Sequence, residues 1–178
     1  MMKQHFECLA EYNQWMNRSI YSTCAQLPFN ELQLDRGAFF KSIWGTLNHL
    51  AVADTLWLKR LSQAFPHWAV LSSMHLRPWP TALDAPLFVS FDALLQERIA
   101  LDQCFIELTA ALTEAELNQP FMFTTTKGVP FKKNLGAVLL HMFNHQTHHR
   151  GQLTTLLSQM AIDFGATDLL LLVPNLES

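Results

Sequence analysis

The sequence predicts an all-α fold, a four-helix bundle with a long crossover between its second and third helices. Apolar residues recur at helical spacing over four stretches, residues 3–27, 39–62, 90–112 and 135–160. Pro, Gly and other helix breakers separate these stretches. The connection over 63–89 is long enough to carry the chain back along the molecule, as a bundle with two consecutive parallel helices requires. These observations favour amphipathic helices packed around one core.

Length and charge narrow the class of protein. At 178 residues, the chain is expected to form one domain, residues 1–178, with a substantial core. No apolar run approaches the roughly 18 residues that cross a bilayer, and the N-terminus lacks the order of a signal peptide. We therefore expect a soluble, cytoplasmic protein with no membrane partner. The net charge of -3, with scattered basic residues, argues against a nucleic-acid partner.

No motif for a nucleophile or a phosphate loop is present. Cys8, Cys24 and Cys104 have no CxxC spacing, which favours small buried side chains in a reducing compartment over a disulfide framework. Carboxylates are scattered over the predicted helix surfaces, so no acid/base pair stands out.

The elements follow from local signals. Phe6 and Met16 mark the apolar face of the first helix, which Pro28 closes. A loop over 28–37 leads to the second helix, whose dense apolar face predicts burial between neighbours. Ser90 is a good N-cap for the third helix. Thr113 and Glu116 have capping-box spacing, which predicts a short extra turn.

Residues 121–133 alternate in polarity around Lys127-Gly128 and predict a hairpin that leads into the last helix. The apolar tail, DFGATDLLLLVPNLES, is expected to pack along the bundle or against a partner chain. His67 and His75 lie in the long connection, where histidines are mostly just exposed.

The last helix carries half of the chain's histidines. On a helical wheel with His141 at zero, its apolar stripe spans about 60° to 160°, with His145 at about 40° and His149 at about 80°. An i, i+4 pair of imidazoles therefore faces the core, where an unpaired polar ring costs free energy. The pair can bind a divalent transition metal. The alternative is two rings at the bundle rim, each hydrogen-bonded and inert.

A firm metal site needs a third donor, and His49 is the only other histidine predicted deep inside a helix. It also has an alternative reading, as a hydrogen-bonded core residue. In a bundle, His49, His145 and His149 can converge on one cation and leave coordination positions open, as in catalytic sites. The metal would lower the pKa of a bound water or thiol. Acceptors for the second ring nitrogens are nearby in sequence, namely Asn48, Asp54, Gln146 and Gln152.

Three motifs carry a family resemblance. NHQTHHRGQL after a hairpin, TLNHLAVADTLWL on the second helix and LAEYNQWMN on the first resemble the DinB/YfiT-like family of bacterial metal-binding four-helix bundles, which is unrelated to the DNA polymerase of the same name. The resemblance covers nearly the whole chain. It implies up-down-down-up helix order, a divalent cation, often zinc or nickel, on His49, His145 and His149, and frequently a homodimer. His141 and His148 are then neighbours of the site, outside the ligand set.

The resemblance also bears on function, because relatives include thiol-dependent S-transferases and isomerases that use low-molecular-weight thiols. The first hypothesis is an enzyme in which a metal-activated water or thiol attacks a small-molecule electrophile, with Arg150, Lys132 or Arg77 lining a thiol pocket. The second is a non-catalytic metal protein, with a structural or stress-sensing role. The third is a bundle that has lost its metal and acts through its apolar tail, against which the presence of all three histidines argues.

Overall fold

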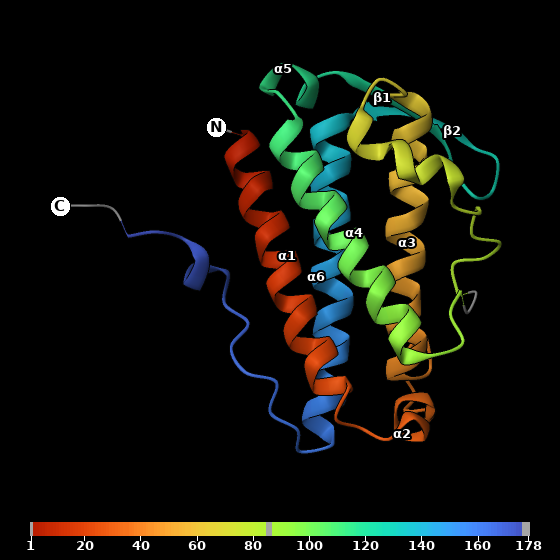
Figure 1. Ribbon diagram of the computed structural model, residues 1–178, viewed down its shortest axis with the longest axis vertical. Coiled ribbons are helices and arrows are strands. Elements are labelled where there is room, and N and C mark those ends of the chain that lie inside the picture. The colour runs from red at the N-terminus through yellow and green to blue at the C-terminus, as the bar shows by residue number, and fades with distance from the viewer. Residues whose placement is uncertain (1, 85–86, 176–178) are drawn as a thin grey trace.

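The computed structural model describes residues 2–84 and 87–175. Within these residues, four long helices dominate, namely α1 (Met2–Cys24), α3 (Ile43–Ala64), α4 (Phe91–Ala111) and α6 (Leu135–Gln159). Figure 1 shows α1 and α6 running in one direction and α3 and α4 in the other. Helix α1 contacts α4 and α6, and α3 contacts the same two helices. A continuous apolar core therefore lies between the four. No helix in the described ranges is long and apolar enough to cross a bilayer.

Short elements connect the long helices at their ends. They are α2 (Phe29–Gln33), the 3-10 helix η1 (Ala69–Leu76), α5 (Glu114–Leu117), the strands β1 (Pro120–Thr124) and β2 (Pro130–Asn134), and η2 (Leu169–Leu172). The strands pair antiparallel around a turn in which Gly128 has a φ of 80°. The chain is thus mostly helical with a small hairpin before the last helix, as the sequence predicts. The capping box of Thr113 and Glu116 is present as well.

The start of the second long helix differs from the prediction. It begins at Ile43 rather than at residue 39, because Ser42 is the N-cap and its hydroxyl accepts a hydrogen bond from the amide of Gly45 at 3.0 Å. The preceding residues form a tight turn in which Lys41 has a left-handed φ of 66°. Apolar Phe39 and Phe40 continue the helical pattern in sequence, which is why periodicity alone placed them inside the helix.

The C-terminal tail lies beside α1, one of the two places expected for it (Figure 1). Two hydroxyls of α1 hold it: Tyr12 donates to the carbonyl of Thr167 at 2.7 Å, and Ser19 donates to that of Phe164 at 2.8 Å. Leu170 and Leu171 nevertheless stay largely exposed.

A buried polar network joins all four long helices, contrary to the expectation that carboxylates lie on helix surfaces. Arg98 of α4 donates to Asp54 of α3 at 2.6 Å and lies 3.0 Å from Asp102 one turn along its own helix. Burial raises the pKa of both carboxyl groups, and the adjacent guanidinium opposes that rise. Amides complete the network: Asn13 and Asn17 of α1 donate to Asp102, and Gln146 of α6 donates to Asp54.

Candidate metal centre

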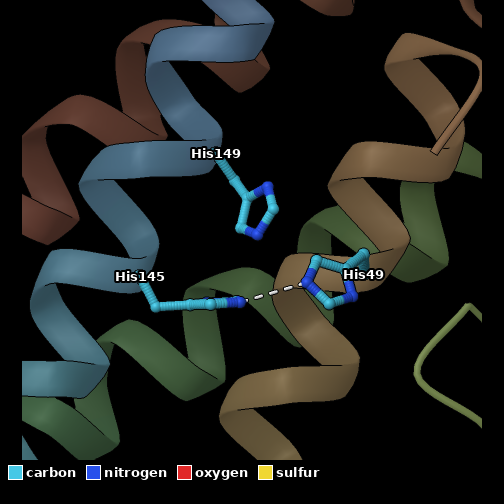
Figure 2. A group of neighbouring side chains, drawn as sticks. All are labelled: His49, His145 and His149. Atoms are coloured by element: carbon cyan, nitrogen blue, oxygen red, sulfur yellow. Dashed lines mark hydrogen bonds between the residues drawn. The ribbon is translucent and has the colours of Figure 1, made fainter. Parts of the chain in front are cut away.

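The structure brings together His49, His145 and His149, the three histidines expected to form one site (Figure 2). His49 lies in the second turn of α3, and the other two lie one turn apart on the face of α6 that is directed at α3. The apolar stripe of α6 is buried, so it fixes the rotation of the helix and directs the adjacent imidazoles inward. His49 and His149 are almost fully buried, and His145 is partly exposed.

The three rings are close enough to share one ion. The Nε2 atoms of His49 and His145 lie 3.1 Å apart, and the candidate ligand atoms of the three residues all lie within 4.8 Å of one another. A tetrahedral cation with nitrogen ligands at about 2.0–2.1 Å needs nitrogen atoms roughly 3.3 Å apart. No other group of three such side chains is found in the described part of the chain.

Hydrogen bonds to the second ring nitrogens fix two of the tautomers. His49 Nδ1 donates to the backbone carbonyl of Leu83 at 2.7 Å, and His149 Nδ1 donates to the side-chain oxygen of Gln152 at 2.8 Å. A carbonyl oxygen can only accept, so the proton of each ring lies on Nδ1 and the Nε2 lone pair is left free. Such acceptors are typical of metal-bound histidines.

Of the four acceptors considered from sequence, only Gln152 has this role. Asp54 and Gln146 belong to the buried network, and the amide of Asn48 donates to the carbonyl of Trp44. The acceptor of His49 is a main-chain group in the long crossover, and no residue type in the sequence identifies it.

Electrostatics favour the neutral, metal-binding form of the rings. Burial lowers the pKa of all three imidazoles, and the pKa of His145 falls to about 3 because the ring is desolvated and faces His149 and His49. Near neutral pH, the rings therefore offer lone pairs without first losing protons. The short Nε2–Nε2 distance needs either a proton or a cation between the two atoms, since two lone pairs repel. These residues fit a divalent cation.

Phe40 completes the wall of the site, and the sequence analysis missed it. Its ring stacks on His49 with centroids 3.8 Å apart and meets His149 edge-on at 5.4 Å. The turn before α3 brings it there. That turn lies so close to the helix that a Cβ at Gly45 would collide with the carbonyl oxygen of Phe40. A glycine in the first turn of an otherwise apolar helix was the available signal.

One side of the group opens into a pocket of about 240 Å³, which His49, His145 and His141 line. The ring centroid of His141 lies 6.1 Å from that of His145, and His148 is exposed and contacts Gln152. Both therefore stay outside the group of three. His49 and His145 therefore border this opening, whereas His149 is not among the residues that line it.

None of the cations expected beside the site lines this pocket. Arg150 is buried and donates to Asn13 in the polar network, Arg77 pairs with Glu97, and Lys132 lies on the exposed hairpin. Arg60 of α3 lines the pocket instead.

Comparison with known proteins shows the family of the chain. Residues 2–173 match the DinB family. The chain is also 26% identical over 160 residues to Protein DinB of Bacillus subtilis (strain 168), and the alignment covers 90% of this chain and 88% of that protein. No solved structure gives a significant match. Since the family match extends over nearly the whole chain, the resemblance read from the sequence motifs is confirmed, and the chain belongs to the DinB family.

Proposed function

We propose that this protein is a divalent-metal-dependent enzyme whose metal ligands are His49, His145 and His149. One observation carries the proposal: three neutral imidazoles converge within 4.8 Å beside a pocket of about 240 Å³. A structural site is normally closed by a fourth protein ligand, whereas three ligands and an open side are typical of catalytic sites. Zinc and nickel are the metals that we favour, because both bind neutral imidazole well.

The residues around the site have separate tasks in this proposal. The carbonyl of Leu83 and the amide of Gln152 hold two imidazoles in the metal-binding tautomer. Phe40 covers one face of the site and restricts water there. When bound, the cation supplies Lewis acidity, which lowers the pKa of a coordinated water or thiol. The pocket would admit a small electrophile, so the reaction class is hydrolysis or transfer of a low-molecular-weight thiol.

A non-catalytic metal protein is the second candidate. It is favoured by the distribution of the ligands over two helices, because a cation on His49 and His145 would join α3 to α6. The two candidates differ in what the open pocket does. Turnover that depends on the metal supports the first, and metal-dependent stability without turnover supports the second.

We extend the proposal to the whole molecule. The four long helices form a four-helix bundle in up-down-down-up order, with the long crossover between α3 and α4, and residues 1–178 constitute one domain. We further propose a cytoplasmic homodimer that acts on a small molecule and has no nucleic-acid or membrane partner. The helix directions in Figure 1 and the family assignment support the bundle.

Metal analysis followed by activity assays tests the proposed function. The wild-type protein should bind one divalent ion per chain, His145→Ala should lose it, and His148→Ala, a matched change just outside the group, should keep it. Metal-loaded protein is then assayed against small electrophiles with and without thiols, and after chelation. Full metal occupancy in His145→Ala would contradict the proposed metal site. Activity that chelation does not change would show that the reaction does not depend on the metal.

A further inference from the structure

A larger pocket adjoins the one at the histidines. It measures about 590 Å³ and lies between the α3 helix, the hairpin and the crossover around Trp79. Both pockets are lined by the same five residues, namely Leu56, Arg60, Phe123, Thr125 and Thr126. Because they share this wall, the two pockets adjoin each other as parts of one cleft beside the imidazoles.

Arg60 lies at the junction of the two pockets. It follows His49 by 11 positions, which places it about 20° away on the same face of α3 and about 16 Å along the axis. The guanidinium lies 4.8 Å from the centroid of the Trp57 ring and 5.5 Å from that of Phe123. These aromatic contacts hold the planar group in one place by cation–π attraction. The aromatic rings contact the guanidinium by cation–π attraction, so its N–H groups remain able to donate hydrogen bonds.

The charge of Arg60 has no counterpart in the described part of the chain. Its guanidinium makes no hydrogen bond and no ion pair there, although it is half-buried and has five donors. No Asp or Glu is among the described residues that line either pocket. Arg77, Arg98 and Arg36, by contrast, each pair with a carboxylate. Burial lowers the pKa of Arg60.

The rest of the wall indicates what kind of anion would fit. Trp57, Phe123 and Trp79 supply apolar surface, and the hydroxyls of Thr125 and Thr126 lie on the hairpin side. The N–H groups of a single guanidinium match the two oxygens of one carboxylate in a bidentate pair. A phosphate dianion is usually met by several cations, and Arg60 is the only Arg or Lys among the described residues that line this cleft.

Resting on the proposed function, we infer that the substrate is a small molecule with an apolar body and a carboxylate, and that Arg60 binds this carboxylate. The reacting group would then lie at the histidine end of the cleft, and the carboxylate would set the distance and orientation. Arg60 is thus a specificity-determining residue.

Binding of matched acids and amides tests this inference. Probes are the phenylalkanoates from phenylacetate to 5-phenylvalerate, each beside its neutral amide, titrated by calorimetry into full-length protein after chelation, so that no metal competes for the carboxylate. At least one acid should bind the wild type about 10- to 100-fold more tightly than its amide, as one charge-assisted pair provides. Arg60→Gln should abolish the preference, and Arg60→Lys, which keeps the charge without the fork, should retain part of it. Arg18→Gln is the matched control, because it removes the same charge from an exposed site on α1.

The outcomes separate this inference from the proposed function. Arg60→Gln should keep its full metal content, since the residue is not a ligand. The inference would be overturned if the wild type showed no preference for an acid over its amide. It would also be overturned if Arg60→Gln or Arg60→Lys kept an unchanged preference and a native circular dichroism spectrum. Neither result would bear on the metal site. Acid preference in a protein that binds no metal would overturn the proposed function alone.

Discussion

Arg98→Met should destabilise the protein strongly, because Arg98 is the cation at the centre of the buried network. It is 2% exposed and lies 2.6 Å from Asp54 and 3.0 Å from Asp102. Methionine fills much of the same volume but leaves two buried carboxylates without their cation. Breaking a buried pair in this way costs about 3–5 kcal/mol. That is a large share of the roughly 5–15 kcal/mol that stabilises a typical domain.

The pH dependence identifies the cause. Arg98 makes the largest contribution against the effect of burial, so without it the pKa of Asp54 and of Asp102 in the folded state rises further above the unfolded value. Each carboxyl group then favours the folded state while it is protonated. This contribution is present at low pH and is lost as pH rises through the folded-state pKa. The difference between the variant and the wild type should therefore be largest near neutral pH and should shrink in acid.

Urea and thermal denaturation, each followed by circular dichroism, measure this effect at pH 7.5 and pH 5. At neutral pH, the melting temperature of Arg98→Met should fall by roughly 10 °C, given about 2–4 °C per kcal/mol for a chain of this size. Arg18→Met, on the exposed surface of α1, is the matched control and should change stability by less than about 0.5 kcal/mol. Equal stability of the two variants at pH 7.5 would show that Arg98 does not stabilise the buried network.

Three further predictions concern the site. Gly45→Ala should lower the melting temperature and weaken zinc binding in a chelator competition, because the new Cβ would push away the turn that holds Phe40 against the site. The control Gly151→Ala, in open space on α6, should be neutral or stabilising by up to about 1 kcal/mol. Equal effects of the two substitutions would contradict the close contact between Gly45 and the carbonyl of Phe40. Gln152→Ala should weaken zinc binding by about 10- to 100-fold without unfolding the protein, and an unchanged affinity would remove its orienting role. Because the pKa of His145 is lowered from 6.5 to about 3, the metal-free protein should lose stability as pH falls below 6.5. His145→Gln should lose less stability over the same pH range. Parallel curves of stability against pH for the two proteins would contradict this expectation.

The sequence predicted the parts of the site that depend on regular periodicity. His145 and His149 lie one turn apart beside an apolar stripe, so their side of the helix follows from spacing alone. The position of His49 opposite them follows from the packing of two long amphipathic helices with inward polar side chains.

The missed parts depend on irregular or tertiary structure. The carbonyl of Leu83 is a main-chain group in a long connection, so no side chain marks it. Phe40 reaches the site through a turn that contains a residue with left-handed φ. The helical periodicity of the apolar residues wrongly placed this turn inside the helix. Arg98 and Asp102 have the i, i+4 spacing of a surface ion pair, and only the crossing of α4 with its neighbours buries them. Arg60 is set apart only because none of the described acidic residues pairs with it.

X-ray absorption at the zinc edge of the reconstituted full-length protein tests the central claim most directly. We expect three imidazole nitrogens at about 2.0–2.1 Å and one further light atom that a small thiol replaces with sulfur. Fewer than three imidazoles, or a fourth protein ligand that no added thiol displaces, would rule out the proposed open three-histidine site.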